Sequence, residues 1–129
     1  MKVSDKDIDN VLKNNKNITG HRFGIYKGRE LTKDDFDKKF SDEVAYLYKH
    51  KHEMQACINW LETAQKRKTI NKYYSSYGMK HLVERKYRCY VSNGAFIVAA
   101  ILSGFDIERC RFDSANAHIN ISSKSDCFG

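Results

Sequence analysis

Residues 92–104 read S-N-G-A-F-I-V-A-A-I-L-S-G, a run that is apolar on nearly every side when it is wound as a helix. Ser92 can cap the start of that helix, and Gly104 can end it in a left-handed conformation. A helix without a polar side must be surrounded by the rest of the chain. We therefore predict a central buried helix over residues 94–102 and a mainly α, compact fold around it.

The length and composition suit a single domain over residues 1–129. With 41% hydrophobic and 30% charged residues, the chain can bury a core without support from metals or disulfides. The four cysteines are widely spaced and include no C-x-x-C pair, which favours reduced thiols. The longest apolar run, residues 95–102, is too short to cross a bilayer, and no secretory signal precedes it. We expect a cytoplasmic protein without a cofactor or a membrane partner.

The N-terminal region carries its own helix signal. Ser4 can cap a helix through about residue 14, and Val3 and Ile8 stand at the two positions of a hydrophobic staple. Residues 18–31 are punctuated by three glycines, which favours a loop or a short irregular hairpin. We expect one short helix followed by irregular chain.

Two more helices are expected before the basic region. Thr32 can cap a short helix that carries Phe36 and Phe40 into the core. From there, apolar side chains recur at helical spacing over residues 42–66, which predicts one long helix with an apolar stripe.

The rest of the chain predicts a connection, an amphipathic helix and a small β element. Residues 69–75 suit a connection, and Ser75 or Ser76 can cap the helix that follows. That helix would bury Met79, Leu82, Val83 and Tyr87 and turn its basic side to solvent. Near the C-terminus, residues 107–112 and 119–121 alternate loosely, which indicates a small two-stranded element.

The whole net charge of +7 lies in residues 66–88, because eight Lys or Arg residues there meet the single acid Glu84. Four tyrosines lie among these cations. Positive charge mixed with aromatic rings is typical of a surface that binds phosphates or another anionic partner. The candidate binding residues are Lys66, Arg67, Lys68, Lys72, Tyr73, Tyr74, Tyr77, Lys80, His81, Arg85, Lys86 and Arg88. We expect Lys66, Arg67 and Lys68 at the end of the long helix, where one continuous patch could form.

Two interpretations of this region stay open. The cations can contact phosphates while Tyr73, Tyr74 or Tyr77 stacks on an unpaired base, with little sequence preference. Alternatively, the region is a solvated basic face whose tyrosines pack their rings into the core. The sequence disfavours a standard helix–turn–helix motif, because residues 94–102 offer no polar side chains to read base edges.

Catalytic and metal-binding patterns are weak. Tyr77, His81 and Arg85 could form a cluster for phosphodiester chemistry, so a nucleic-acid-processing enzyme is an alternative. His50 and His52 are two residues apart and would point to different sides of a helix, which does not suit a shared metal ion. We expect neither catalysis nor a metal site.

Several short segments carry a resemblance to a known group of proteins. They are residues 69–71 (T-I-N), 75–77 (S-S-Y), 80–84 (K-H-L-V-E) and 90–97 (Y-V-S-N-G-A-F-I). In these segments, within about residues 60–112, the chain resembles small accessory proteins of bacteriophages and other mobile elements. The resemblance implies a role against a bacterial host, of the anti-CRISPR or anti-restriction type, and a host nucleoprotein complex as target. The basic charge departs from inhibitors that imitate DNA.

The sequence therefore favours a non-enzymatic basic binding protein that acts in the bacterial cytoplasm. Its expected partner is nucleic acid or a host nucleoprotein complex, or an acidic protein surface. Another alternative is a purely protein-binding or self-associating helical module, in which exposed aromatic side chains and one face of residues 42–66 form the interface and the charge aids solubility.

Overall fold

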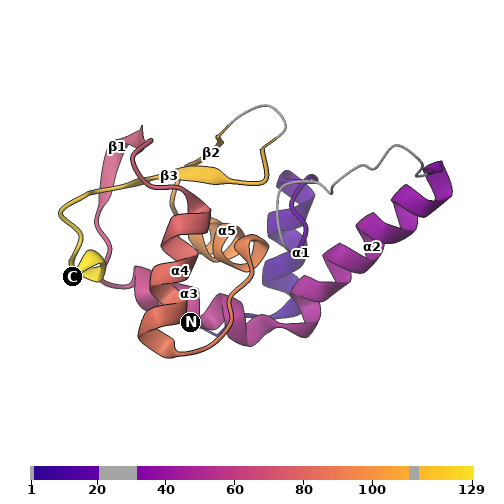
Figure 1. The fold of residues 1–129 in the computed structure, drawn as a ribbon, viewed down its shortest axis with the longest axis horizontal. Helices are drawn as coiled ribbons and strands as arrows, with labels where there is room; N and C mark the ends of the chain where they lie inside the picture. The colour runs from indigo at the N-terminus through magenta and orange to yellow at the C-terminus, as the bar shows by residue number, and fades with distance from the viewer. Residues whose placement is uncertain (1, 21–31, 111–113) are drawn as a thin grey trace.

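The computed structural model of the chain describes residues 2–20, 32–110 and 114–129, and shows a predominantly helical protein with one small sheet (Figure 1). Much of the expected segment 18–31 lies outside the described residues. The sheet lies on one side of the helices, and α2 extends away from them on the other. The elements are α1 (Asp5–Asn14), α2 (Lys33–Lys49), α3 (Lys51–Leu61), β1 (Lys66–Asn71), α4 (Ser76–Tyr87), α5 (Asn93–Leu102), β2 (Ile107–Arg109), β3 (Ala117–Ile121) and a final 3-10 turn (Asp126–Phe128).

Helix α5 is the buried centre, as its sequence predicts. Every residue from 93 to 100 is buried, and α1, α3 and α4 all pack against the helix. The side chain of Ser92 accepts a hydrogen bond from the Ala95 amide, and Gly104 follows the helix with a φ of 87°. Both ends of α5 are therefore capped by the residues that the sequence indicates.

The start of α5 lies directly against the chain that follows α1. The Gly94 amide donates to the Gly20 carbonyl at 3.2 Å, and the Gly20 amide donates to the Glu43 carbonyl at 2.8 Å. A Cβ atom on Gly94 would stand 1.8 Å from the Thr19 carbonyl oxygen. This close backbone contact joins α1, α2 and α5, and it requires glycine at position 94.

The N-terminal helix confirms its predicted start. Ser4 and Asp7 form a reciprocal capping box, and Val3 and Ile8 are both buried in the core. The acidic first turn of α1 also complements the positive end of the helix dipole.

The predicted division of residues 32–66 into a short and a long helix is wrong. Helix α2 runs without interruption from its Thr32 cap to Lys49, and α3 begins at Lys51. The break lies at His50. Its ring Nδ1 hydrogen-bonds to the Tyr46 carbonyl at 2.9 Å, and its backbone amide donates to the Leu47 carbonyl instead of to that of Tyr46. A side chain has therefore replaced the regular backbone bond, which ends the helix there.

An apolar stripe still runs along one side of α2 and α3, but its buried part begins at Leu47, later than expected. Leu47, Met54, Ile58 and Leu61 are buried in the core. Phe36 and Phe40 were expected in the core as well, and this expectation is wrong. Both are only partly buried and stack on each other at 6.4 Å between ring centroids, on the part of α2 that extends away from the other helices.

The sheet has three antiparallel strands in the order β1-β3-β2, so the expected two-stranded element is incomplete. Strands β2 and β3 pair in regular register. The third strand, β1, comes from residues that the sequence assigned to a helix end and a connection. It pairs with β3 at its two ends only, with an irregularity between them.

Side chains complete the hydrogen bonding that this irregular pairing leaves out. The Asn120 amide group donates to the Arg67 carbonyl, and the Asn71 amide group donates to the Ile121 carbonyl, both at 2.9 Å. These bonds hold the protruding middle of β1 on the sheet.

Within the described ranges, no helix combines the length and the hydropathy needed to cross a membrane.

Candidate functional site

The first three candidate cations lie on β1 and not at the end of a helix, which corrects their predicted placement. Lys66, Arg67 and Lys68 are all exposed, as expected. The guanidinium of Arg67 donates to the carbonyls of Thr69 and Ile70 at 2.9 and 3.0 Å, so it supports the protruding strand. In the described part of the chain, neither Lys66 nor Lys68 forms an ion pair, although Lys66 lies over the Phe105 ring.

In the turn after β1, Tyr73 is exposed to solvent and the next residue, Tyr74, is partly buried. Tyr73 is 84% exposed, and its amide donates to the Asn71 side chain at 3.1 Å. Tyr74 stacks on Phe128 with ring centroids 4.1 Å apart and almost parallel. The ring of Tyr74 is thus used inside the protein, whereas the ring of Tyr73 is accessible to a ligand. Lys72 forms a weak, exposed ion pair with Glu108 at 3.7 Å.

Lys80 departs most from its predicted role. It is buried, with 6% of its surface exposed, and its Nζ lies 3.4 Å from Glu84 on the next helical turn. The rings of Tyr77 and Tyr90 lie on the ammonium at 5.3 and 5.2 Å to their centroids. The ion pair and the two rings replace the water around this charge, so Lys80 is unavailable to a phosphate.

Glu84 is the centre of this small network. Its carboxylate accepts from the Val91 amide at 3.1 Å and lies 2.8 Å from His81 Nδ1. Partial burial opposes ionisation, but these contacts and Lys80 hold the pKa of Glu84 below its ordinary value. The single acid of the basic region therefore ties α4 to the chain that leads into α5.

The network predicts a specific acid sensitivity. Because the folded-state pKa of Glu84 lies below the ordinary value of 4.5, its ionised form contributes stability above pH 4.5 that is lost as the pH falls through the folded-state pKa. We expect the difference in unfolding free energy between the wild type and Glu84→Gln to shrink below pH 4.5. Urea denaturation at neutral and acidic pH measures it. A difference that stays constant over that range contradicts this role.

One row of candidate residues on α4 does face outward. Tyr77, His81 and Arg85 are spaced by four residues, and the rings of Tyr77 and His81 meet edge to face at 4.4 Å. Tyr77 is 51% exposed and Arg85 is exposed. His81 with Glu84 has the geometry of an oriented imidazole, which is the chemically most capable pair in the region.

The hydroxyls next to this row are occupied by structural bonds. Ser75 Oγ accepts from the Gly78 amide at 3.1 Å and caps α4, as predicted. Ser76 Oγ accepts from the Ala117 amide at 3.0 Å and attaches the helix to β3.

The remaining cations lie at the other end of α4. Arg85, Lys86 and Arg88 are exposed on its last turn, and Arg88 ends the helix with a left-handed φ of 53°. Lys86 lies over the Tyr87 ring at 5.6 Å. The twelve residues of α4 correspond to about 18 Å, so these cations are well separated from the turn that precedes the helix.

The exposed cations of the charged stretch are thus carried by two parts of the fold: β1 with the turn after it, and the last turn of α4. We call the first group, Lys66, Lys68, Lys72 and Tyr73, the β1 surface. The second group comprises the cations on the last turn of α4. Lys80 and Tyr74 belong to neither group, because Lys80 is buried and the partly buried ring of Tyr74 stacks on Phe128.

Sequence reasoning missed two residues that shape this region. Tyr90 is 56% exposed and covers Lys80. Glu53 is 1% exposed and accepts hydrogen bonds from the Ser92 amide at 2.7 Å and from the Tyr46 hydroxyl at 2.5 Å. The position of Glu53 beside the apolar stripe of α3 could have identified it from the sequence, because an acid buried there needs hydrogen-bond partners.

The described ranges hold no group of three or more His, Cys, Asp or Glu side chains arranged to bind a metal ion. Cys57 is buried, and burial raises the pKa of its thiol well above the ordinary value.

Comparisons of the chain with protein-family models, with curated proteins and with solved structures find no match.

Proposed function

We propose that this is a non-enzymatic binding protein whose β1 surface contacts nucleic acid, either free or within a host nucleoprotein complex. The observation that supports this most directly is Tyr73, which is 84% exposed beside the exposed cations of β1. The Tyr73 amide is held by the Asn71 side chain, and its ring meets Tyr74 edge to face at 4.9 Å between centroids, which leaves most of the ring surface exposed to stack on another planar group.

The chemistry of the β1 surface suits a single strand. Base–aromatic stacking contributes about 1–3 kcal/mol for each base and tolerates any sequence. Lys66 and Lys68 supply positive charge for phosphates of the bound strand, and Arg67 holds the shape of β1 through the Thr69 and Ile70 carbonyls. An unpaired base on Tyr73 with phosphates on the lysines is the arrangement that these residues favour.

The biological setting is part of the same proposal. The resemblance to accessory proteins of bacteriophages and mobile elements supports an action in the bacterial cytoplasm against a host defence complex, of the anti-CRISPR or anti-restriction type. The charge supports a target that exposes phosphate, because a protein of net charge +7 cannot imitate DNA. Inhibition would then follow from occupation of a nucleoprotein surface that the host complex needs.

Charge reversal on β1 tests the proposal. We expect Lys66→Glu with Lys68→Glu to weaken binding of a labelled single-stranded oligonucleotide about tenfold or more at low salt. Loss of two phosphate contacts should also reduce the slope of log affinity against log salt by about 1.4. Fluorescence anisotropy over a salt series measures both. Arg67 is kept, because its side chain supports the strand.

The matched control is Lys6→Glu with Lys39→Glu, which makes the same change in net charge at exposed positions of α1 and α2. We expect this control to retain most of the affinity. Equal losses in both variants would show that binding depends on total charge and contradict a site at β1. Cleaved oligonucleotide would favour the nucleic-acid-processing alternative, for which His81 and Glu84 are the candidate pair.

A further inference from the structure

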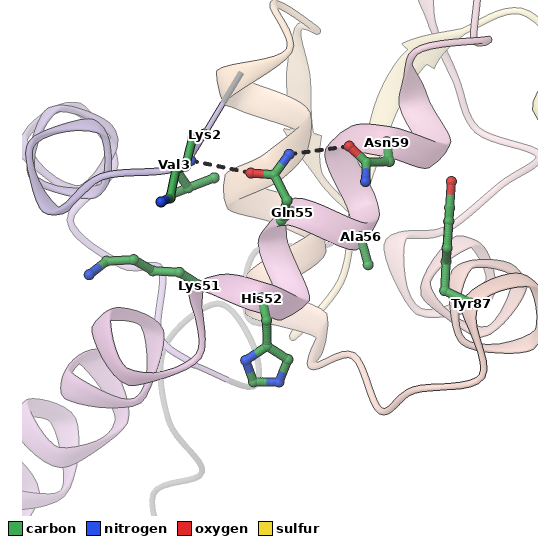
Figure 2. A pocket seen from close by; sticks show the side chains of 8 residues that line it. All are labelled: Lys2, Val3, Lys51, His52, Gln55, Ala56, Asn59 and Tyr87. Atoms are coloured by element: carbon green, nitrogen blue, oxygen red, sulfur yellow. Dashed lines mark hydrogen bonds between the residues drawn. The ribbon is translucent and has the colours of Figure 1, made fainter.

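A groove of about 420 Å³ lies away from β1, between the start of the chain, one side of α3 and the last turn of α4 (Figure 2). Figure 2 shows Val3 on one side, Tyr87 on the other, and Ala56 on α3 between them. These three residues make the floor largely apolar. Nothing in the proposed contact of β1 with nucleic acid uses this surface.

The polar groups around the groove are mainly donors and cations. The Val3 amide donates to Gln55 Oε1 at 3.3 Å, and Gln55 Nε2 donates to Asn59 Oδ1 at 3.2 Å, as the dashed lines in Figure 2 show. Each side-chain amide oxygen therefore already accepts one hydrogen bond, whereas Asn59 Nδ2 remains as a donor at the exposed end of the chain of bonds.

The charged side chains at the rim of the groove also favour an acidic ligand. Lys2 and Lys51 both line the groove, and none of the described lining residues is acidic. Lys51 pairs with Asp5, so Lys2 is the rim cation without an acid in the described part of the chain. Lys86 adds positive charge behind the Tyr87 ring. Such a rim favours carboxylates and disfavours a basic ligand.

The shape suits a segment of a protein chain. Residues 51 to 59 of α3 run beside the groove for about 12 Å, which is close to two turns of a helical ligand. An apolar floor of this length accepts the apolar side chains of an amphipathic segment, and a donor-rich rim binds its acidic ones.

We infer that this groove binds an acidic amphipathic segment of a protein partner, with apolar side chains between Ala56 and Tyr87 and carboxylates at Lys2 and Asn59. The inference is independent of the proposed contact between β1 and nucleic acid. A protein with both surfaces could engage the protein and the nucleic-acid parts of one complex.

Two labelled peptides of about ten residues provide the probe, one alternating pairs of Glu and Leu and the other with Lys in place of Glu. We expect the acidic peptide to bind at least about tenfold more tightly by fluorescence anisotropy. In the ¹⁵N-labelled protein, its binding should shift the amide signals of Ala56, Asn59 and Tyr87. Equal binding of the two peptides, or shifts confined to other elements, overturns the inference.

Two variants test the groove itself. Asn59→Asp keeps the acceptor for Gln55 and replaces the outward donor with a carboxylate, so it should weaken the acidic peptide about tenfold without loss of fold. Ala56→Trp fills the floor and should abolish binding, whereas the same change at Ala45 on α2 should not. Unchanged affinity in Asn59→Asp, or binding of decanoate with neither peptide, contradicts a protein segment as the ligand.

Discussion

Gly94→Ala is expected to destabilise the protein by about 3 kcal/mol or more, because the added methyl group has no space. Its carbon would lie 1.8 Å from the Thr19 carbonyl oxygen and 2.6 Å from that of Gly20. Both neighbours are backbone atoms, so the chain after α1 must separate from α5. The hydrogen bond from the Gly94 amide to Gly20 would be lost in the same movement.

Gly78→Ala is the matched control on α4. A Cβ there meets only the Ser75 hydroxyl at 3.5 Å, which is an ordinary contact, and alanine is the better helix former. We expect the control to gain about 0.5–1 kcal/mol. Urea denaturation of the two variants measures the difference. A Gly94→Ala protein as stable as the wild type would show that α5 does not contact the 19–20 segment as described.

Glu53→Ala is the second change with a large expected effect, about 3 kcal/mol of lost stability. The variant leaves the buried amide of Ser92 and the hydroxyl of Tyr46 without their acceptor. It also removes a negative charge from the N-terminal end of α5, where the helix dipole favours one. Desolvation by burial and the Glu53 carboxylate raise the pKa of Tyr46 well above its ordinary value.

Glu53→Gln keeps a hydrogen-bond acceptor at this position but removes the negative charge. Its amide oxygen can still accept from Ser92, so we expect a smaller loss of about 1 kcal/mol. The order wild type, Gln, Ala in the free energy of unfolding therefore tests whether Glu53 holds α3 to the start of α5. Equal stability of the alanine variant and the wild type would contradict that role.

The helices with strong local signals could be predicted from the sequence. Ser4, Thr32, Ser75 and Ser92 all cap the helices that they were expected to cap. A cap needs only the few residues that follow it, and an all-apolar helix leaves no choice of environment. Local consistency of this kind made the mainly α fold and its central helix predictable.

The errors concern interactions between distant residues. The β1 strand depends on pairing with Ile119 and Ile121, about fifty residues later, and no local signal announces that pairing. The end of α2 depends on the ring of His50 competing for the Tyr46 carbonyl. Periodicity alone predicts a continuous helix there, because side-chain competition does not change the apolar spacing.

The candidate site was predictable as a list of residues but not as a surface. Lys80 looked like its basic neighbours, although Glu84 stands four residues later and was the only acid nearby. Its burial depends on Tyr90, which approaches from the chain after α4. Tyr73 and Tyr74 are adjacent in sequence, and the stacking of Tyr74 on the distant Phe128, which partly buries that ring, is not visible in the local sequence.

The most direct test of the central claim is to map the contact of a single-stranded oligonucleotide on the ¹⁵N-labelled protein by NMR. We predict that the largest shifts fall on Lys66, Lys68 and Tyr73, and that they disappear in the Lys66→Glu, Lys68→Glu variant. Shifts centred on α1 or α2, or no shifts at low salt, would contradict a nucleic-acid contact at the β1 surface.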